Sequence, residues 1–176
     1  MFLPINMRNY TAIDILSARE ERVDFQNTLL EKYKLPLLCL RVNYPGAIKN
    51  NEISRDISNI LIREIENKFH TQIVYKYYKS TAEGPILILI IDNIAEEIKK
   101  HSIYVEENHL LGRCADIDVY NVDGTGISRT SLGYKPRKCF ICEDMAQNCV
   151  RSRRHSIEEV INYIEERYRK FNNINI

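Results

Sequence analysis

An unbroken apolar run from Pro85 to Ile91 is the feature that most constrains the fold of this chain. The run is far shorter than the roughly 20 apolar residues that a membrane-spanning helix needs. Gly84 and Asp92 bound it, and its isoleucines and leucines are typical of a strand that is buried on both faces. The run therefore predicts an inner strand of a sheet in a folded core.

Apolar residues at helical spacing predict two long helices before this run and one near the C-terminal end of the chain. They recur every seven positions in residues 14–32, and every three or four positions in residues 51–68. The last helix begins after Ser156, which forms a capping-box pattern with Glu159. A short helix is expected over residues 93–100. The apolar stripe expected on the first helix consists of Leu16, Val23 and Leu30, and Phe25 is expected to pair with Leu29.

Further strands are predicted where apolar, aromatic and β-branched residues run or alternate. These segments are residues 37–42, 72–78, 102–105 and 114–120. Turn-forming residues follow the last segment, so Ile127 is expected to begin a return strand, as in a β-hairpin, or a loop. The chain has 176 residues, the length of one ordinary domain. We therefore expect a single α+β domain over residues 1–176, with a mixed or antiparallel sheet flanked by helices.

Asp116 and Asp118 lie two positions apart in one predicted strand. Such positions point to the same face of a strand, while Ile117 and Val119 point into the core. Two carboxylates this close repel each other unless a cation lies between them, and they suit Mg²⁺ bound together with substrate phosphates. The pair is a candidate site for phosphoryl or nucleotidyl transfer. Two exposed carboxylates without a catalytic role are the alternative.

The charge of the chain is uneven, although its net charge is only +1. Residues 127–155 contain seven cations and two acids, a local charge of +5, so the remainder carries −4. Together with Arg113, this basic segment places anion ligands next to the aspartates in sequence, an arrangement that suits a triphosphate. A solvated basic surface is the alternative interpretation.

We expect no secretory signal, because Arg8 and Asp14 interrupt the apolar residues at the amino end. Metal binding or free thiols are therefore expected for the five cysteines rather than a disulfide framework. Cys139-x-x-Cys142, followed by Cys149 and His155, offers the ligand types of a structural zinc site. The second pair is six positions apart, wider than usual, so ordinary thiols fit this pattern as well. A catalytic pair of Cys149 and His155 is a third interpretation, without an identifiable orienting group. Two other cysteines are expected in the core: Cys39 and Cys114.

Several ordered motifs extend from about residue 15 to residue 165. The central one is Gly112-Arg113-Cys114-Ala115-Asp116-Ile117-Asp118-Val119. The others are Ala18-Arg19-Glu20-Glu21-Arg22, Asn43-Tyr44-Pro45-Gly46 with Lys49, Thr81-Ala82-Glu83, Glu106-Glu107-Asn108-His109, Ile127-Ser128-Arg129, and residues 136–142 and 149–156. With these motifs the chain resembles the CitX family, the transferases that install the prosthetic group on the acyl carrier protein of citrate lyase.

The resemblance implies a reaction and a role for each matching residue. The family transfers the 2′-(5″-phosphoribosyl)-3′-dephospho-CoA group from triphosphoribosyl-dephospho-CoA to a serine of the apo acyl carrier protein, the gamma subunit of citrate lyase, and releases diphosphate. This chemistry is nucleotidyl transfer, so a nucleotidyltransferase-like fold is implied. Asp116 and Asp118 would be catalytic and hold Mg²⁺, with Glu83 or Glu106 as a third carboxylate. The donor phosphates would be bound by Arg113, Arg129, Arg137, Lys138, Arg151, Arg153 and Arg154.

Three other functions compete with this hypothesis. The same transfer to the carrier protein of malonate decarboxylase would differ only in the acceptor. A zinc-supported nucleic-acid-binding module would use the cysteines, His155 and the basic segment, but the near-neutral net charge and the two adjacent acids argue against it. A protein that binds the carrier without catalysis is the third. We expect a cytoplasmic enzyme whose partners include neither nucleic acid nor membrane.

Overall fold

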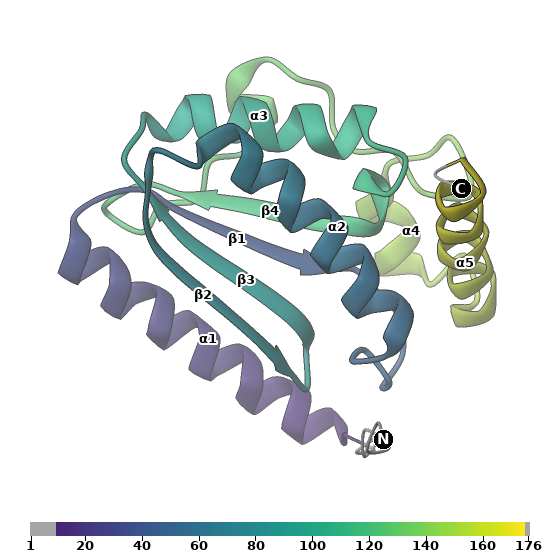
Figure 1. The fold of residues 1–176 in the computed structure, drawn as a ribbon. Coiled ribbons are helices and arrows are strands. Elements are labelled where there is room, and N and C mark those ends of the chain that lie inside the picture. The colour runs from purple at the N-terminus through teal and green to yellow at the C-terminus, as the bar shows by residue number, and fades with distance from the viewer. Residues whose placement is uncertain (1–9, 175–176) are drawn as a thin grey trace.

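The computed structural model describes residues 10–174 and contains a four-stranded antiparallel sheet with helices on both faces (Figure 1). The strand order is β2-β3-β1-β4, so β4 lies at one edge. The strands are β1 (Leu37–Val42), β2 (Ile73–Thr81), β3 (Gly84–Ile91) and β4 (Ala115–Tyr120). The predicted α+β class is confirmed, and every strand pair in this sheet is antiparallel.

The two faces of the sheet are covered by different numbers of helices. One face is covered by α1, and the other by α2 and α3, while α4 and α5 lie beyond the end of the sheet at which β4 begins (Figure 1). Their bounds are α1 Ala12–Tyr33, α2 Glu52–Phe69, α3 Ala95–Asn108, α4 Ala146–Ser152 and α5 Ile157–Ile174, with short 3-10 helices at Gly112–Cys114 and Thr130–Leu132. No helix within residues 10–174 combines the length and apolarity needed to cross a bilayer.

Alternating side chains of the inner strands divide the core in two. Leu38 and Leu40 of β1 pack in the cluster that includes α2 and α3, whereas Leu37 and Cys39 pack in the cluster that includes α1. Every residue of β3 is buried, because both faces of this inner strand are covered. The two-sided burial predicted from the apolar run is therefore confirmed.

The predicted cap of α5 is also present. The backbone N–H of Ser156 donates to Glu159 Oε2 at 2.7 Å, and the N–H of Glu159 donates to Ser156 Oγ at 3.1 Å. These bonds satisfy two of the backbone donors that a helix leaves unpaired at its start. They define where α5 begins, directly after the basic segment.

The apolar stripe predicted for α1 is correct for Leu30 and wrong for its other two residues. The helix forms as expected, but Leu16 and Val23 are exposed by 54% and 43%. The buried residues of α1 are Arg22, Gln26, Leu29 and Leu30. Arg22 turns toward the sheet because its guanidinium pairs with Glu83, and this contact sets which side of α1 is buried.

One prediction after β3 is wrong, and another is confirmed in part. Residues 102–105 are not a strand but the continuation of α3, because Ser102 and Val105 extend the buried face that begins at Ala95 and Ile98. The expected return after β4 forms as a loop: Gly126 makes an isolated bridge with Tyr120, and the N–H of Ile127 donates to the carbonyl of Val119 at 2.8 Å. The chain that follows lies along the edge of β4 without forming a strand.

Candidate active site

Asp116 and Asp118 occupy alternate positions of the edge strand β4. Ala115, Ile117 and Val119 are buried against the core that contains α2 and α3, so the two carboxylates point to the opposite face. Their side chains are 32% and 40% exposed. The alternation expected from the sequence therefore places both carboxylates on one partly open surface.

Each of these aspartates is paired with an arginine. Arg137 Nη1 lies 2.5 Å from Asp116 Oδ1, and Arg41 Nη2 lies 3.0 Å from Asp118 Oδ2. Arg41 comes from β1, where it is directly opposite Asp116. Burial raises the pKa of Asp116 above its ordinary value, and Arg137 and Arg41 oppose this shift. The two guanidinium groups supply the positive charge that adjacent carboxylates require.

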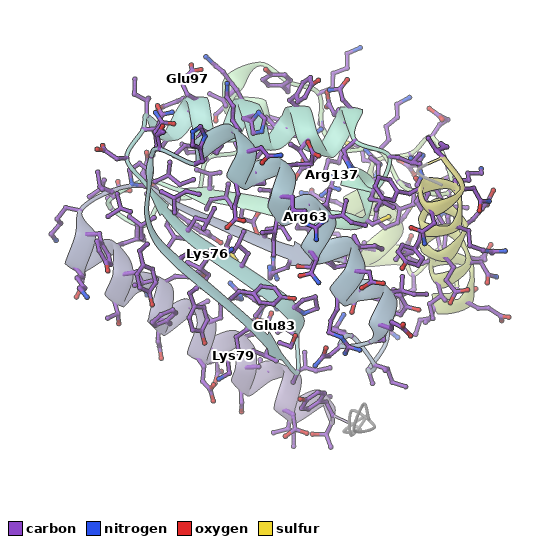
Figure 2. The ribbon with its side chains drawn as sticks, viewed as in Figure 1. Arg63, Lys76, Lys79, Glu83, Glu97 and Arg137 are labelled. Carbon is purple, nitrogen blue, oxygen red and sulfur yellow. The ribbon has the colours of Figure 1, made fainter. Side chains whose placement is uncertain are left out.

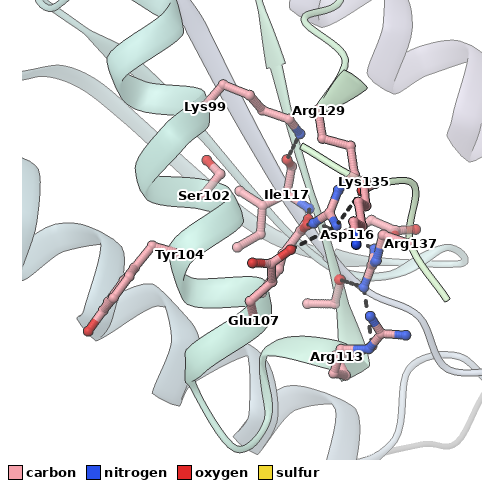
Figure 3. Close-up of polar contacts among 12 residues, drawn as sticks. Lys99, Ser102, Tyr104, Glu107, Arg113, Asp116, Ile117, Arg129, Lys135 and Arg137 are labelled. Atoms are coloured by element: carbon pink, nitrogen blue, oxygen red, sulfur yellow. Dashed lines mark hydrogen bonds and ion pairs between the residues drawn. The ribbon is translucent and has the colours of Figure 1, made fainter. Parts of the chain in front are cut away.

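Side chains form hydrogen bonds with the backbone groups at the outer edge of β4 (Figure 3). Glu106 accepts the N–H of Ile117 at 3.1 Å, and Lys99 Nζ donates to the carbonyl of Ile117 at 2.8 Å. Arg137 Nη2 donates to the carbonyl of Ala115 at 3.0 Å. An edge strand has no neighbour to bond these groups, so the side chains take the place of a further strand. Burial lowers the pKa of Lys99, and Glu106 opposes that shift.

Glu106 is one of the two candidates for a third carboxylate, and both of its carboxylate oxygens accept hydrogen bonds from other residues. Its side chain is 4% exposed, and Arg129 Nη2 donates to its Oε2 at 2.7 Å, while Oε1 bonds Ile117. Arg129 also pairs with Glu107 at 3.1 Å. Glu106 therefore holds both β4 and Arg129 in place.

Glu83, the other candidate, lies in the turn between β2 and β3 (Figure 2). Its Oε2 is 2.8 Å from Arg22 Nε, and its Oε1 is 3.6 Å from Arg41 Nη1. Arg41 thus joins Glu83 to Asp118, and Glu83 is not among the residues that line the cavity next to the aspartates.

The aspartates form part of the wall of a cavity of about 1520 Å³. Eight cations and three acids line it. The cations are Arg41, Lys49, Lys99, Arg129, Arg137, Lys138, Arg151 and Arg153, and the acids are Glu106, Asp116 and Asp118. This cavity combines carboxylates with an excess of positive charge, as a site for a polyphosphate and a cation requires.

The cavity includes most of the predicted phosphate ligands. Arg129, Arg137, Lys138, Arg151 and Arg153 line it. Arg113 lines a smaller cavity of about 440 Å³ that shares Arg129 and Arg137 with the larger one. Arg154 lines neither cavity and pairs with Asp144 at 2.9 Å.

Comparisons with known proteins assign the chain to a family. The family model for CitX, apo-citrate lyase phosphoribosyl-dephospho-CoA transferase, matches residues 10–171. The chain belongs to the CitX family. Apo-citrate lyase phosphoribosyl-dephospho-CoA transferases of Escherichia coli O7:K1 and Shigella boydii serotype 18 are each 34% identical to it over 155 residues, which cover 86% of this chain and 85% of the relative.

Three cations of the cavity in this CitX chain were not predicted from the sequence. Lys49 lies just after the family-like motif at residues 43–46, and this proximity could have predicted that Lys49 lines the cavity. Arg41 is a lone cation in an otherwise apolar strand, which is also a usable signal. Lys99 gave no signal, because its partner is a backbone carbonyl of a strand distant in sequence.

The second group of predicted ligands forms what we call the cysteine cluster: Cys139, Cys142, Cys149 and His155. Their sulfur and nitrogen atoms all lie within 4.8 Å of one another. Cys139, Cys149 and His155 also line the large cavity. Cys39 and Cys114 are buried, as predicted, and desolvation raises the pKa of each to about 11.

Proposed function

We propose that this chain transfers a phosphoribosyl-dephospho-CoA group to the apo acyl carrier protein of citrate lyase. The names of its relatives support the reaction. The structural observation that carries the proposal is the position of Asp116 and Asp118 in the wall of a cation-lined cavity. The donor in this proposal is triphosphoribosyl-dephospho-CoA, and the acceptor is a serine hydroxyl of the carrier.

The proposed step breaks a phosphoanhydride bond of the donor and forms a phosphodiester with the carrier. The serine oxygen attacks the phosphorus nearest the ribose, and a new oxygen–phosphorus bond forms. The bond from that phosphorus to the diphosphate group breaks, diphosphate leaves, and the hydroxyl proton is lost to solvent. Negative charge builds on the transferred phosphate and the leaving group, so a site that catalyses the step must supply fixed positive charge.

The cations of the cavity meet this requirement, and several are free to bind the donor. The side chains of Arg151 and Arg153 make no ion pair or hydrogen bond with any residue in the range 10–174. The Nε of Arg41 is buried without a partner in the same range. Phosphate oxygens of the donor would satisfy these groups with charge-assisted hydrogen bonds.

Asp116 and Asp118 would hold Mg²⁺ in this proposal. Both offer hard oxygen ligands from one face of β4, and Mg²⁺ usually takes one or two carboxylates and completes its shell with water and substrate phosphates. The ion would neutralise charge on the donor phosphates. Among the described residues, no third carboxylate converges on the pair. We therefore assign Glu106 as a positioning residue for β4 and Arg129.

The reaction is tested by incubating the purified protein with Mg²⁺, the apo carrier and triphosphoribosyl-dephospho-CoA, and measuring the intact mass of the carrier. We expect a gain equal to the phosphoribosyl-dephospho-CoA group. Asp116→Asn and a chelator should each abolish it, whereas the matched variant Asp24→Asn, at an exposed position of α1, should retain it. Modification of the malonate decarboxylase carrier alone would reassign the acceptor. No gain on either carrier from a folded sample would contradict the proposed reaction.

A further inference from the structure

The cysteine cluster has a geometry that the proposed transfer does not use. Cys142 Sγ lies 3.4 Å from Cys149 Sγ, and His155 Nε2 lies 3.3 Å from Cys142 Sγ. A tetrahedral zinc ion with bonds of about 2.3 Å to sulfur and 2.0 Å to nitrogen separates neighbouring ligand atoms by about 3.5–3.8 Å. These two pairs thus already have nearly the spacing of a tetrahedral site, and all four ligand atoms lie within 4.8 Å of one another.

The backbone around the cluster is shaped to present these ligands. Cys139 and Cys142 lie in a tight turn that is closed by a bridge between Lys138 and Met145. The N–H of Ile141 points at Cys139 Sγ at 3.5 Å, as a donor to a thiolate does. Such a turn brings both sulfurs of a Cys-x-x-Cys pair to one side.

The other two ligands come from a second turn. Cys149 lies on α4, and the helix ends at Arg153 in the left-handed conformation, with φ of 47°. The N–H of Arg154 then bonds the carbonyl of Cys149 at 3.1 Å, which returns the chain so that His155 faces the sulfurs. Two local turns therefore meet at one point.

Hydrophobic burial does not explain the conformation of this segment. Between residues 121 and 160, all of which the structure describes, Cys149 is the only buried residue. Ile141, Met145 and Val150 are exposed by 38%, 49% and 77%. A segment with so little core usually needs another source of stability, and a bound metal is one that these ligands offer.

We propose that the cysteine cluster binds one structural Zn²⁺ ion. Three sulfurs and one imidazole favour zinc over Mg²⁺, and four protein ligands leave no open position for catalysis. Each cysteine thiol loses its proton as its bond to zinc forms, and no oxidant is required. The resulting site has a net charge of −1, and the Arg154 guanidinium, with Nη1 3.9 Å from Cys142 Sγ, compensates it. This role accounts for the position of Arg154 outside both cavities.

The ion would also order one wall of the donor cavity. Lys138, Arg151 and Arg153 line that cavity and lie within a few positions of a zinc ligand in the sequence. Without the ion, the segment that carries these cations would lose one of its restraints. Backbone amides of residues 138–155 should then exchange hydrogen faster after removal of zinc, while those of β1 and β3 should not change.

The test measures metal directly and needs neither donor nor carrier. We expect elemental analysis of the reduced, purified protein to find one zinc per chain, and Co²⁺ added to the zinc-free protein to give the visible absorption of tetrahedral thiolate ligation. Cys142→Ser and His155→Gln should lose both signals. His70→Gln, at an exposed position after α2, is the matched control and should retain them.

Three results would overturn the zinc site. The first is a folded, reduced wild-type protein that neither holds zinc nor gives the cobalt absorption. The second is undiminished zinc in both ligand variants, with folding checked by circular dichroism. The third is a metal-free chain whose mass shows a disulfide between Cys142 and Cys149. Because the readout is metal content, the transfer activity and the zinc site succeed or fail separately.

Discussion

Glu83→Gln tests whether a buried ion pair fastens α1 to the sheet and supports the aspartates. Glu83 accepts two hydrogen bonds from Arg22, with Nε at 2.8 Å and Nη2 at 3.3 Å. It also lies 3.6 Å from Arg41, which pairs with Asp118. Glutamine keeps the shape of the side chain and removes its charge. The variant therefore measures how much the negative charge of Glu83, apart from its packing, contributes to stability.

The expected magnitude follows from the burial of the pair. The side chains of Arg22 and Glu83 are only 6% and 8% exposed, so glutamine would leave the Arg22 charge buried without an acid. Removing one partner of a buried pair typically costs about 3–5 kcal/mol. At this chain length, about 1 kcal/mol lowers Tm by about 2–4 °C, so we expect Tm to fall by about 6–20 °C.

Thermal and denaturant unfolding of the purified variants measures this change. Glu97→Gln removes an acid from an exposed pair with Lys100 and should have no measurable effect. Arg22→Met combined with Glu83→Gln removes both charges and should recover a large part of the lost stability. A change in unfolding free energy below about 1 kcal/mol for Glu83→Gln would refute the reasoning, because only a solvated pair is that weak.

Three further predictions concern packing, pH and donor binding. Gly112→Ala should destabilise the fold by about 1–3 kcal/mol, because an added Cβ would lie 2.0 Å from the carbonyl oxygen of Val105; an unchanged Tm would contradict this close approach. Burial lowers the pKa of His109 below its ordinary value of 6.5, and its Nδ1 accepts the N–H of Leu111 at 3.0 Å. The unfolded chain therefore binds a proton on His109 more readily than the folded chain does, so Tm should fall as the pH drops through about 6.5. His109→Gln should make this fall of Tm less steep. Equal slopes of Tm against pH in the two proteins would contradict this role of His109. Arg151→Gln should raise KM for the triphosphate donor about tenfold with little change in kcat. If steady-state kinetics show an unchanged KM, Arg151 does not contact a donor phosphate.

Signals that act over a few residues predicted the local structure of this chain correctly. The run from Pro85 to Ile91 forms the inner strand that its apolar character indicates. Ser156 and Glu159 cap α5 as their spacing predicts. Asp116 and Asp118 share one face of β4 because alternation is a property of the strand itself.

Predictions failed where the partner of a residue is distant in the chain. Helical spacing could not show that Arg22 would be buried, because its acid, Glu83, is 61 residues away. The strand predicted over residues 102–105 is helical because its apolar residues pack as part of a longer buried face. The roles of Lys99 and Glu106 depend on β4 being an edge strand, which the strand order determines.

The sequence by itself determined the class of the fold, the position of the paired aspartates on one strand face, and the ligand types of the cysteine cluster. These follow from residue identity and from the backbone period of two in a strand. Only the tertiary structure decided which cations meet the aspartates, which carboxylate supports β4, and that two separate turns bring three sulfurs and an imidazole together. The reason is physical: a buried charge or an unpaired backbone group must find a partner in space, and the fold determines which residue is near enough to provide it.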